Sequence, residues 1–160
     1  MRTGLLKYPK ISRRGFTLAE LLIVVLIVGI VAGIAIPRFS AGLGQRQATA
    51  LARQMVNDIE TVRQVARASS APKSLVITSA SKTYTLNGVE HPDRNNIAYV
   101  VSLADVASTA RFGTINFGGD PVLIFNGFGY PDSGGSVQII VGTVTKTVTV
   151  DAQTGSSTIQ

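Results

Sequence analysis

The fold is decided by residues 12–37, which read SRRGFTLAELLIVVLIVGIVAGIAIP. From Phe16 to Pro37 this stretch is a run of 22 residues whose single charged side chain is Glu20. At about 1.5 Å per helical residue the run is roughly 33 Å long, enough to cross the hydrocarbon core of a bilayer. We therefore expect residues 16–37 to form a transmembrane helix.

Basic residues are concentrated before this run. The chain has 15 Lys and Arg against 9 Asp and Glu, and five of the 15 lie in residues 1–15, which leaves 10 against 9 for the remainder. Most of the basicity is therefore a topology signal, because positive residues hold the preceding end in the cytoplasm and send the following part outward. A cleaved secretory signal has its cut after the apolar core, whereas here the plausible cut precedes it.

Residues 13–22, RRGFTLAELL, closely resemble the cleavage and methylation motif of type IV pilins and of type II secretion pseudopilins. The resemblance implies that a prepilin peptidase removes the leader, residues 1–15, by cutting between Gly15 and Phe16. It also implies N-methylation of the new amino group of Phe16. Gly15 suits such a cut because it places no side chain in the path of an extended backbone. The chain is expected to be a substrate here and no enzyme.

Glu20 places a carboxylate inside the apolar run. Such a group costs about 2.5–3.5 kcal/mol at mid-bilayer, and the helix N-terminus offsets about 0.3–1 kcal/mol of that cost. The resemblance to pilins implies that the amino group of a neighbouring subunit supplies the rest, which makes Glu20 an assembly residue. The alternative is a carboxylate that snorkels to the lipid surface.

An amphipathic helical pattern continues through residues 38–71. Pro37 removes one backbone hydrogen bond, so we expect one long helix that is bent near Pro37. Gly29 and Gly33 either allow another helix to approach closely or supply flexibility. The apolar stripe beyond the bend comprises Phe39, Leu43, Ala48, Leu51, Met55, Ile59, Val62 and Ala66.

Residues 72–160 change to short β-rich runs that are separated by Gly, Asn, Asp and Pro. Asn87-Gly88 predicts a hairpin turn, and the alternation of residues 144–150 predicts a strand with one buried face. We expect an α+β fold in which the C-terminal half of the long helix packs on an antiparallel sheet, as in pilins. The expected strands are 75–79, 83–86, 97–102, 114–117, 122–126, 136–141 and 144–150. Residues 115–155 are similar to the C-terminal domain of GspH/FimT-like minor pseudopilins.

Catalytic chemistry has little support. His91, the single histidine, lies in a polar, proline-containing stretch that predicts an exposed loop, and Ser133 lacks a nucleophile motif and an identifiable base. Residues 118–120 and 131–134 offer oxygen ligands for calcium, but turn formation explains both stretches. We expect no metal site and no cofactor, with calcium as a minor alternative.

Arginines along the helix raise the question of nucleic acid. Their row, Arg38, Arg46, Arg53, Arg63 and Arg67, has the composition of a phosphate-binding face. However, residues 154–160 contain no basic residue, and from Ala68 onward the chain has five basic against six acidic side chains. A solvated helix face or salt bridges between subunits are therefore favoured over DNA.

Taken with the resemblance, these features predict a minor pseudopilin or pilin that is anchored in the inner membrane with its sheet domain outside the cytoplasm. Its expected partners are other pilin or pseudopilin subunits, the prepilin peptidase with its methyltransferase activity, and the membrane. The alternatives are a DNA-binding minor pilin, a major pilin, or a signal-anchored envelope protein. Many major pilins close a C-terminal loop with a disulfide, and this chain has no cysteine.

Overall fold

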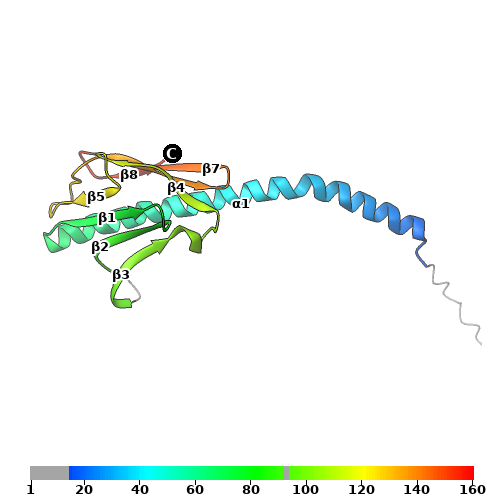
Figure 1. The fold of residues 1–160 in the computed structure, drawn as a ribbon, viewed down its shortest axis with the longest axis horizontal. Helices are drawn as coiled ribbons and strands as arrows, with labels where there is room; N and C mark the ends of the chain where they lie inside the picture. The colour runs from blue at the N-terminus through cyan, green and yellow to red at the C-terminus, as the bar shows by residue number, and fades with distance from the viewer. Residues whose placement is uncertain (1–14, 92–93) are drawn as a thin grey trace, which may run out of the picture. The chain divides into compact units, whose positions relative to one another are not determined.

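The computed structural model describes residues 15–91 and 94–160, with the backbone alone for residues 35–41 and 94–96. The chain divides into two compact units, Met1–Arg38 and Phe39–Gln160. Figure 1 shows the elements, which are α1 (Leu18–Ser69), β1 (Lys73–Thr78), β2 (Thr83–His91), β3 (Arg94–Ser102), the 3₁₀ helix η1 (Leu103–Asp105), β4 (Ala110–Phe117), β5 (Val122–Phe125), β6 (Gly135–Val141), β7 (Val144–Val150) and β8 (Ser157–Ile159).

In the unit Phe39–Gln160, α1 buries an apolar stripe. The exposed fraction is at most 2% for Ala48, Leu51, Met55, Ile59, Val62 and Ala66, as the spacing of these residues predicts. Leu43 differs, because its side chain is 48% exposed. At this level the helix approaches the sheet through Gly44, where an added Cβ would lie 3.5 Å from the carbonyl oxygen of Val141. Leu43, one residue earlier on the helix, consequently points away.

The strands form two four-stranded antiparallel sheets in the orders β3-β2-β1-β5 and β4-β6-β7-β8. Apolar side chains alternate along the strands, so that Val137, Ile139 and Val141 of β6 are buried. Together with the helix stripe they belong to one hydrophobic core. The predicted α+β class, with the helix packed on antiparallel sheet, is confirmed, but the sheet is divided in two.

Asn87-Gly88 does not form the predicted hairpin turn. Strand β2 continues through both residues to His91, and its pairing with β3 shifts between Leu86 and Glu90. Gly88 has a φ of +75°, which glycine adopts without strain. The irregularity lets Val89 follow Leu86 into the core, where strict alternation would have left it outside. Asn-Gly favours positive φ in a bulge as much as in a turn.

Helix α1 runs through Pro37, so the prediction of one long helix is confirmed. The predicted bend at Pro37 stays a prediction, because the side chains of residues 35–41 lie outside the described ones. Among the described residues, no helix is both long and apolar enough to cross a membrane. The predicted span, residues 16–37, extends into that gap.

Candidate processing and assembly segment

Gly15 and Phe16, the residues on either side of the predicted cut, lie in irregular backbone before α1. A Cβ added to Gly15 would meet no atom within 4 Å. The side chain of Phe16 is 79% exposed. The peptide bond between them is thus open to an enzyme, whereas Arg13 and Arg14 lie outside the described residues.

Thr17 is the N-cap of α1. The amide of Glu20 donates a hydrogen bond to Thr17 Oγ1 at 3.2 Å, and the amide of Leu21 donates to the carbonyl oxygen of Thr17 at 3.2 Å. The spacing of Thr17 and Glu20 is that of a capping box, a signal that the analysis of the sequence missed. Glu20 is therefore held in the first turn, where the helix dipole favours a carboxylate.

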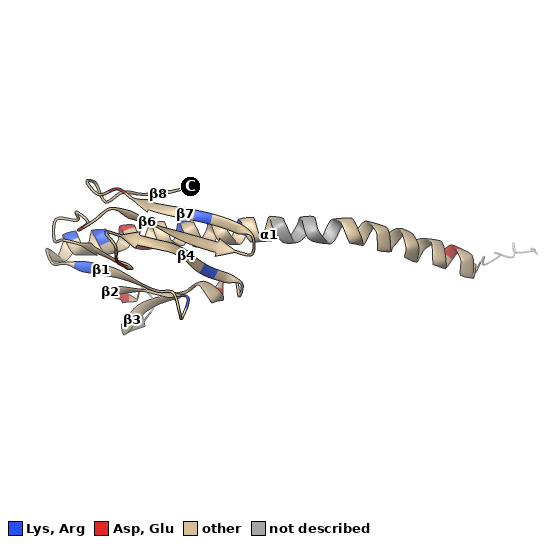
Figure 2. Ribbon diagram, turned by 45° about the horizontal axis from the view of Figure 1, so that its top comes forward, with Lys and Arg blue, Asp and Glu red and all other residues tan. Residues whose placement is uncertain are grey.

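Past this cap the helix is apolar on every side. Between Leu18 and Ile34 the one charged residue is Glu20 (Figure 2). A helix that is apolar all round is normally buried in lipid or protein. Twelve large apolar side chains, counting Phe16, are at least half exposed: Phe16, Leu18, Leu21, Leu22, Ile23, Val24, Val25, Leu26, Ile27, Val28, Ile30 and Val31.

Gly29 and Gly33 leave room beside this helix. A Cβ built at either residue meets no atom within 4 Å. The open space is compatible with close approach of another helix and with a merely flexible helix, so both interpretations of the pair stand.

Asp58 is a second candidate, which the analysis of the sequence missed because it is a single acidic residue in an amphipathic helix. It is 5% exposed and accepts hydrogen bonds from the hydroxyls of Tyr84 (2.5 Å) and Tyr99 (3.1 Å). Burial raises the pKa of Asp58, and the two hydrogen bonds oppose that shift. The cluster joins α1 to β2 and β3, which indicates a structural role.

His91 is not the exposed loop residue that was predicted. It is the last residue of β2 and is half-buried, with its ring edge-on to Tyr99 at a centroid distance of 5.2 Å. The β-bulge lengthens β2 and carries His91 into the sheet. Within the described residues, no three His, Cys, Asp or Glu side chains are grouped so as to hold a metal ion.

The two stretches considered for calcium are turns. Asp132 Oδ1 accepts hydrogen bonds from the amides of Ile124 (3.1 Å) and Ser133 (2.9 Å), so this carboxylate is committed to the backbone. Gly118 and Gly119 both have positive φ and form the turn before Asp120.

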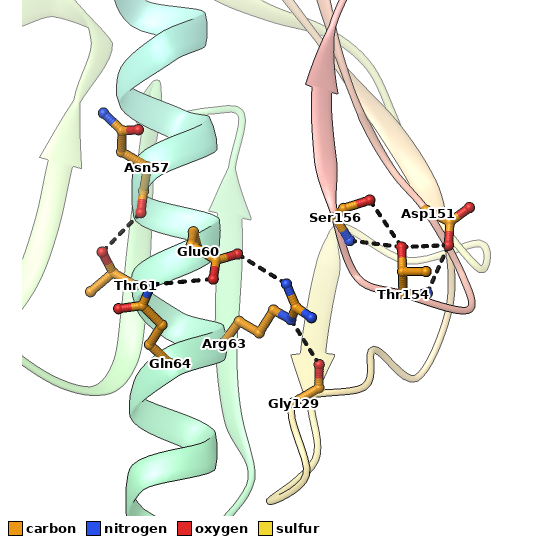
Figure 3. A network of polar contacts seen from close by, with 9 residues as sticks. All are labelled: Asn57, Glu60, Thr61, Arg63, Gln64, Gly129, Asp151, Thr154 and Ser156. Atoms are coloured by element: carbon orange, nitrogen blue, oxygen red, sulfur yellow. Dashed lines mark hydrogen bonds and ion pairs between the residues drawn. The ribbon is translucent and has the colours of Figure 1, made fainter.

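One of the helix arginines is engaged within the domain. Arg63 pairs with Glu60 at 3.2 Å and donates from Nε to the carbonyl oxygen of Gly129 at 3.1 Å (Figure 3). Arg46, Arg53 and Arg67 are exposed, and their heptad spacing puts them in one row with Glu60. This row mixes both signs of charge, as solvated helix faces do.

Comparison with known protein families finds one match, to the prokaryotic N-terminal methylation motif over residues 10–36. No solved structure matches the chain. The matched stretch includes Gly15, Phe16, Thr17 and Glu20, together with the apolar part of α1. It indicates a subunit of the pilin or pseudopilin type, which is processed by a prepilin peptidase and assembles with other pilins.

Proposed function

We propose that the chain is a minor, GspH/FimT-like subunit of a type II secretion pseudopilus or a type IV pilus. It is held in the inner membrane by one span, residues 16–37, with the domain that follows outside the cytoplasm. The observation that carries this proposal is the juxtaposition of an open Gly15–Phe16 bond, the cap at Thr17, and a helix with apolar side chains on every side. The role is mechanical, and the chain performs no catalysis.

Processing is the first step. Cleavage between Gly15 and Phe16 frees the amino group of Phe16, which is then methylated. Because α1 begins at Leu18, the new terminus lies one residue before the N-cap. The carboxylate of Glu20, one turn into the helix, is thereby placed to attract the amino group of a neighbouring subunit.

Assembly is the second step. The apolar side chains of α1 leave lipid and pack against the helices of other subunits. Fully burying one Val, Leu or Ile side chain is worth about 1.5–3 kcal/mol relative to leaving it in water, so the segment is stable only in lipid or in a bundle. Since lipid is as apolar as the bundle, an external motor must drive the extraction.

Two substitutions separate processing from assembly. Gly15→Ala is expected to impair cleavage, and its Cβ disturbs nothing in the fold, so a loss of cleavage reports on the peptidase. Glu20→Ala is expected to be cleaved normally but to be absent from sheared fibres, while Glu20→Asp, which keeps the carboxylate, retains partial assembly. Normal assembly of Glu20→Ala would refute the proposed role of Glu20.

A further inference from the structure

Residues 126–130 form a tight loop that presents two aromatic side chains. The side-chain oxygen of Asn126 accepts hydrogen bonds from the amides of Phe128 and Tyr130, both at 3.0 Å, and the amide of Gly129 donates to the carbonyl oxygen of Asn126 at 2.8 Å. Phe128 is nevertheless 81% exposed and Tyr130 56% exposed. The loop is ordered by its own backbone contacts and not by burial of its rings.

The C-terminal end of α1 fixes this loop in place. Arg63 donates to the carbonyl oxygen of Gly129, as Figure 3 shows. A Cβ on Gly129 would lie 2.5 Å from Cγ and Cδ of Arg67, so the aliphatic part of Arg67 lies directly against the loop. Arg67 and Phe128 line the same surface hollow. An aromatic ring and a guanidinium are therefore presented together in a preorganised arrangement, and these are residue types that concentrate binding energy at protein interfaces.

A second surface of the same unit has the complementary chemistry. Where β3 passes into η1, a hollow of about 240 Å³ is bordered by Val100, Val106 and Asp105. Val100 is 49% exposed and Val106 39% exposed, and the side chain of Asp105 is also exposed. The hollow has room for a phenyl ring, since an engineered apolar cavity of about 150 Å³ holds benzene.

The charges of the two surfaces are opposite and available. Within the described part of the chain, neither Arg67 nor Asp105 takes part in an ion pair. A ring with an adjacent cation on one surface thus corresponds to an apolar hollow with an adjacent carboxylate on the other.

We infer that the loop 126–130 of one copy of this chain docks into the hollow at β3 and η1 of a second copy. Phe128 enters between Val100 and Val106, and Arg67 pairs with Asp105. Because the two surfaces differ, the contact is heterologous and can repeat from copy to copy without closing. The inference rests on the proposed function and deepens it, because it requires copies of this chain to be neighbours in the assembly.

Paired cysteines test the contact, since the natural chain has none. Full-length Tyr130→Cys and Ala104→Cys chains, both altered at exposed positions, are co-expressed in membranes and oxidised. Residue 104 adjoins Asp105, so we expect a disulfide-linked dimer in at least about tenfold excess over a control pair, Tyr130→Cys with the exposed Thr145→Cys. Equal yields for the two pairs, or no dimer, would overturn the inference.

Charge reversal shows whether the dimer uses the proposed pair. Arg67→Glu in the Tyr130→Cys chain, or Asp105→Lys in the Ala104→Cys chain, opposes like charges and should lower the yield about tenfold or more. The two reversals combined should restore it. A yield that is indifferent to the single reversals, or no recovery in the combination, contradicts the contact. A chain that is processed at Phe16 and yet gives no 130–104 dimer rejects this inference alone, whereas an intact Met1 terminus rejects the proposed function.

Discussion

At the scale of single residues, Asp58 and Thr17 each fix a piece of the fold through hydrogen bonds. Asp58 is the buried charged side chain of the described core, and its carboxylate joins α1 to two strands. Thr17 sets the residue at which α1 begins. Both were hidden in the sequence, because a single Asp in an amphipathic helix looks like a surface residue, and a lone Thr before an apolar run looks incidental.

Asp58 should make stability depend on pH. Its pKa is raised from 3.8, so the neutral carboxyl is favoured in the folded chain. The stabilisation is complete below the unfolded pKa and is lost as pH rises through the raised folded pKa. The free energy of unfolding of wild type should therefore fall relative to that of Asp58→Asn as pH rises, which urea unfolding in detergent at several pH values measures.

The matched control for this experiment is Asp120→Asn, since Asp120 is exposed. Its difference from wild type should change little over the same pH range. If Asp58→Asn also tracks wild type at every pH, the burial of this carboxylate does not govern its titration.

Thr17→Ala should loosen the first turn of α1. Replacing an N-cap Thr by Ala costs about 0.5–2 kcal/mol, so the amide hydrogen of Glu20 should exchange several-fold faster. Thr17→Ser keeps the accepting oxygen and should exchange like wild type. Equal exchange in Thr17→Ala and wild type would show that the cap is unimportant.

At the scale of elements, the helix was predictable and the sheet less so. The stripe from Ala48 to Ala66 repeats with helical period and is buried as expected. The division into two sheets depends on contacts between distant strands, which local patterns do not encode. The bulge in β2 and the three-residue β8 escaped because turn residues also suit bulges and because so short a strand has no measurable period.

Ile59→Ala tests the packing of α1. Ile59 is fully buried, so its truncation should lower the free energy of unfolding by about 2–5 kcal/mol. Leu43→Ala removes more side chain from the same helix, but Leu43 is 48% exposed and the change should stay within about 0.5 kcal/mol. Chemical unfolding of both variants in detergent compares them directly, and equal losses would contradict the burial pattern.

At the scale of the whole molecule, the chain separates two tasks. Every described core residue belongs to the unit Phe39–Gln160, whereas the first unit offers its apolar side chains to its surroundings. The matched motif ties that first unit to processing and assembly. Removing residues 1–15 would also remove five of the 15 basic side chains, which leaves a nearly neutral mature chain with little general attraction for nucleic acid.

The N-terminus of the mature protein tests the central claim most directly. The chain is expressed with a prepilin peptidase, extracted from membranes and analysed by mass spectrometry of its N-terminal peptide. We predict that the peptide begins at Phe16 with a methylated amino group. A peptide that begins at Met1 would contradict the account.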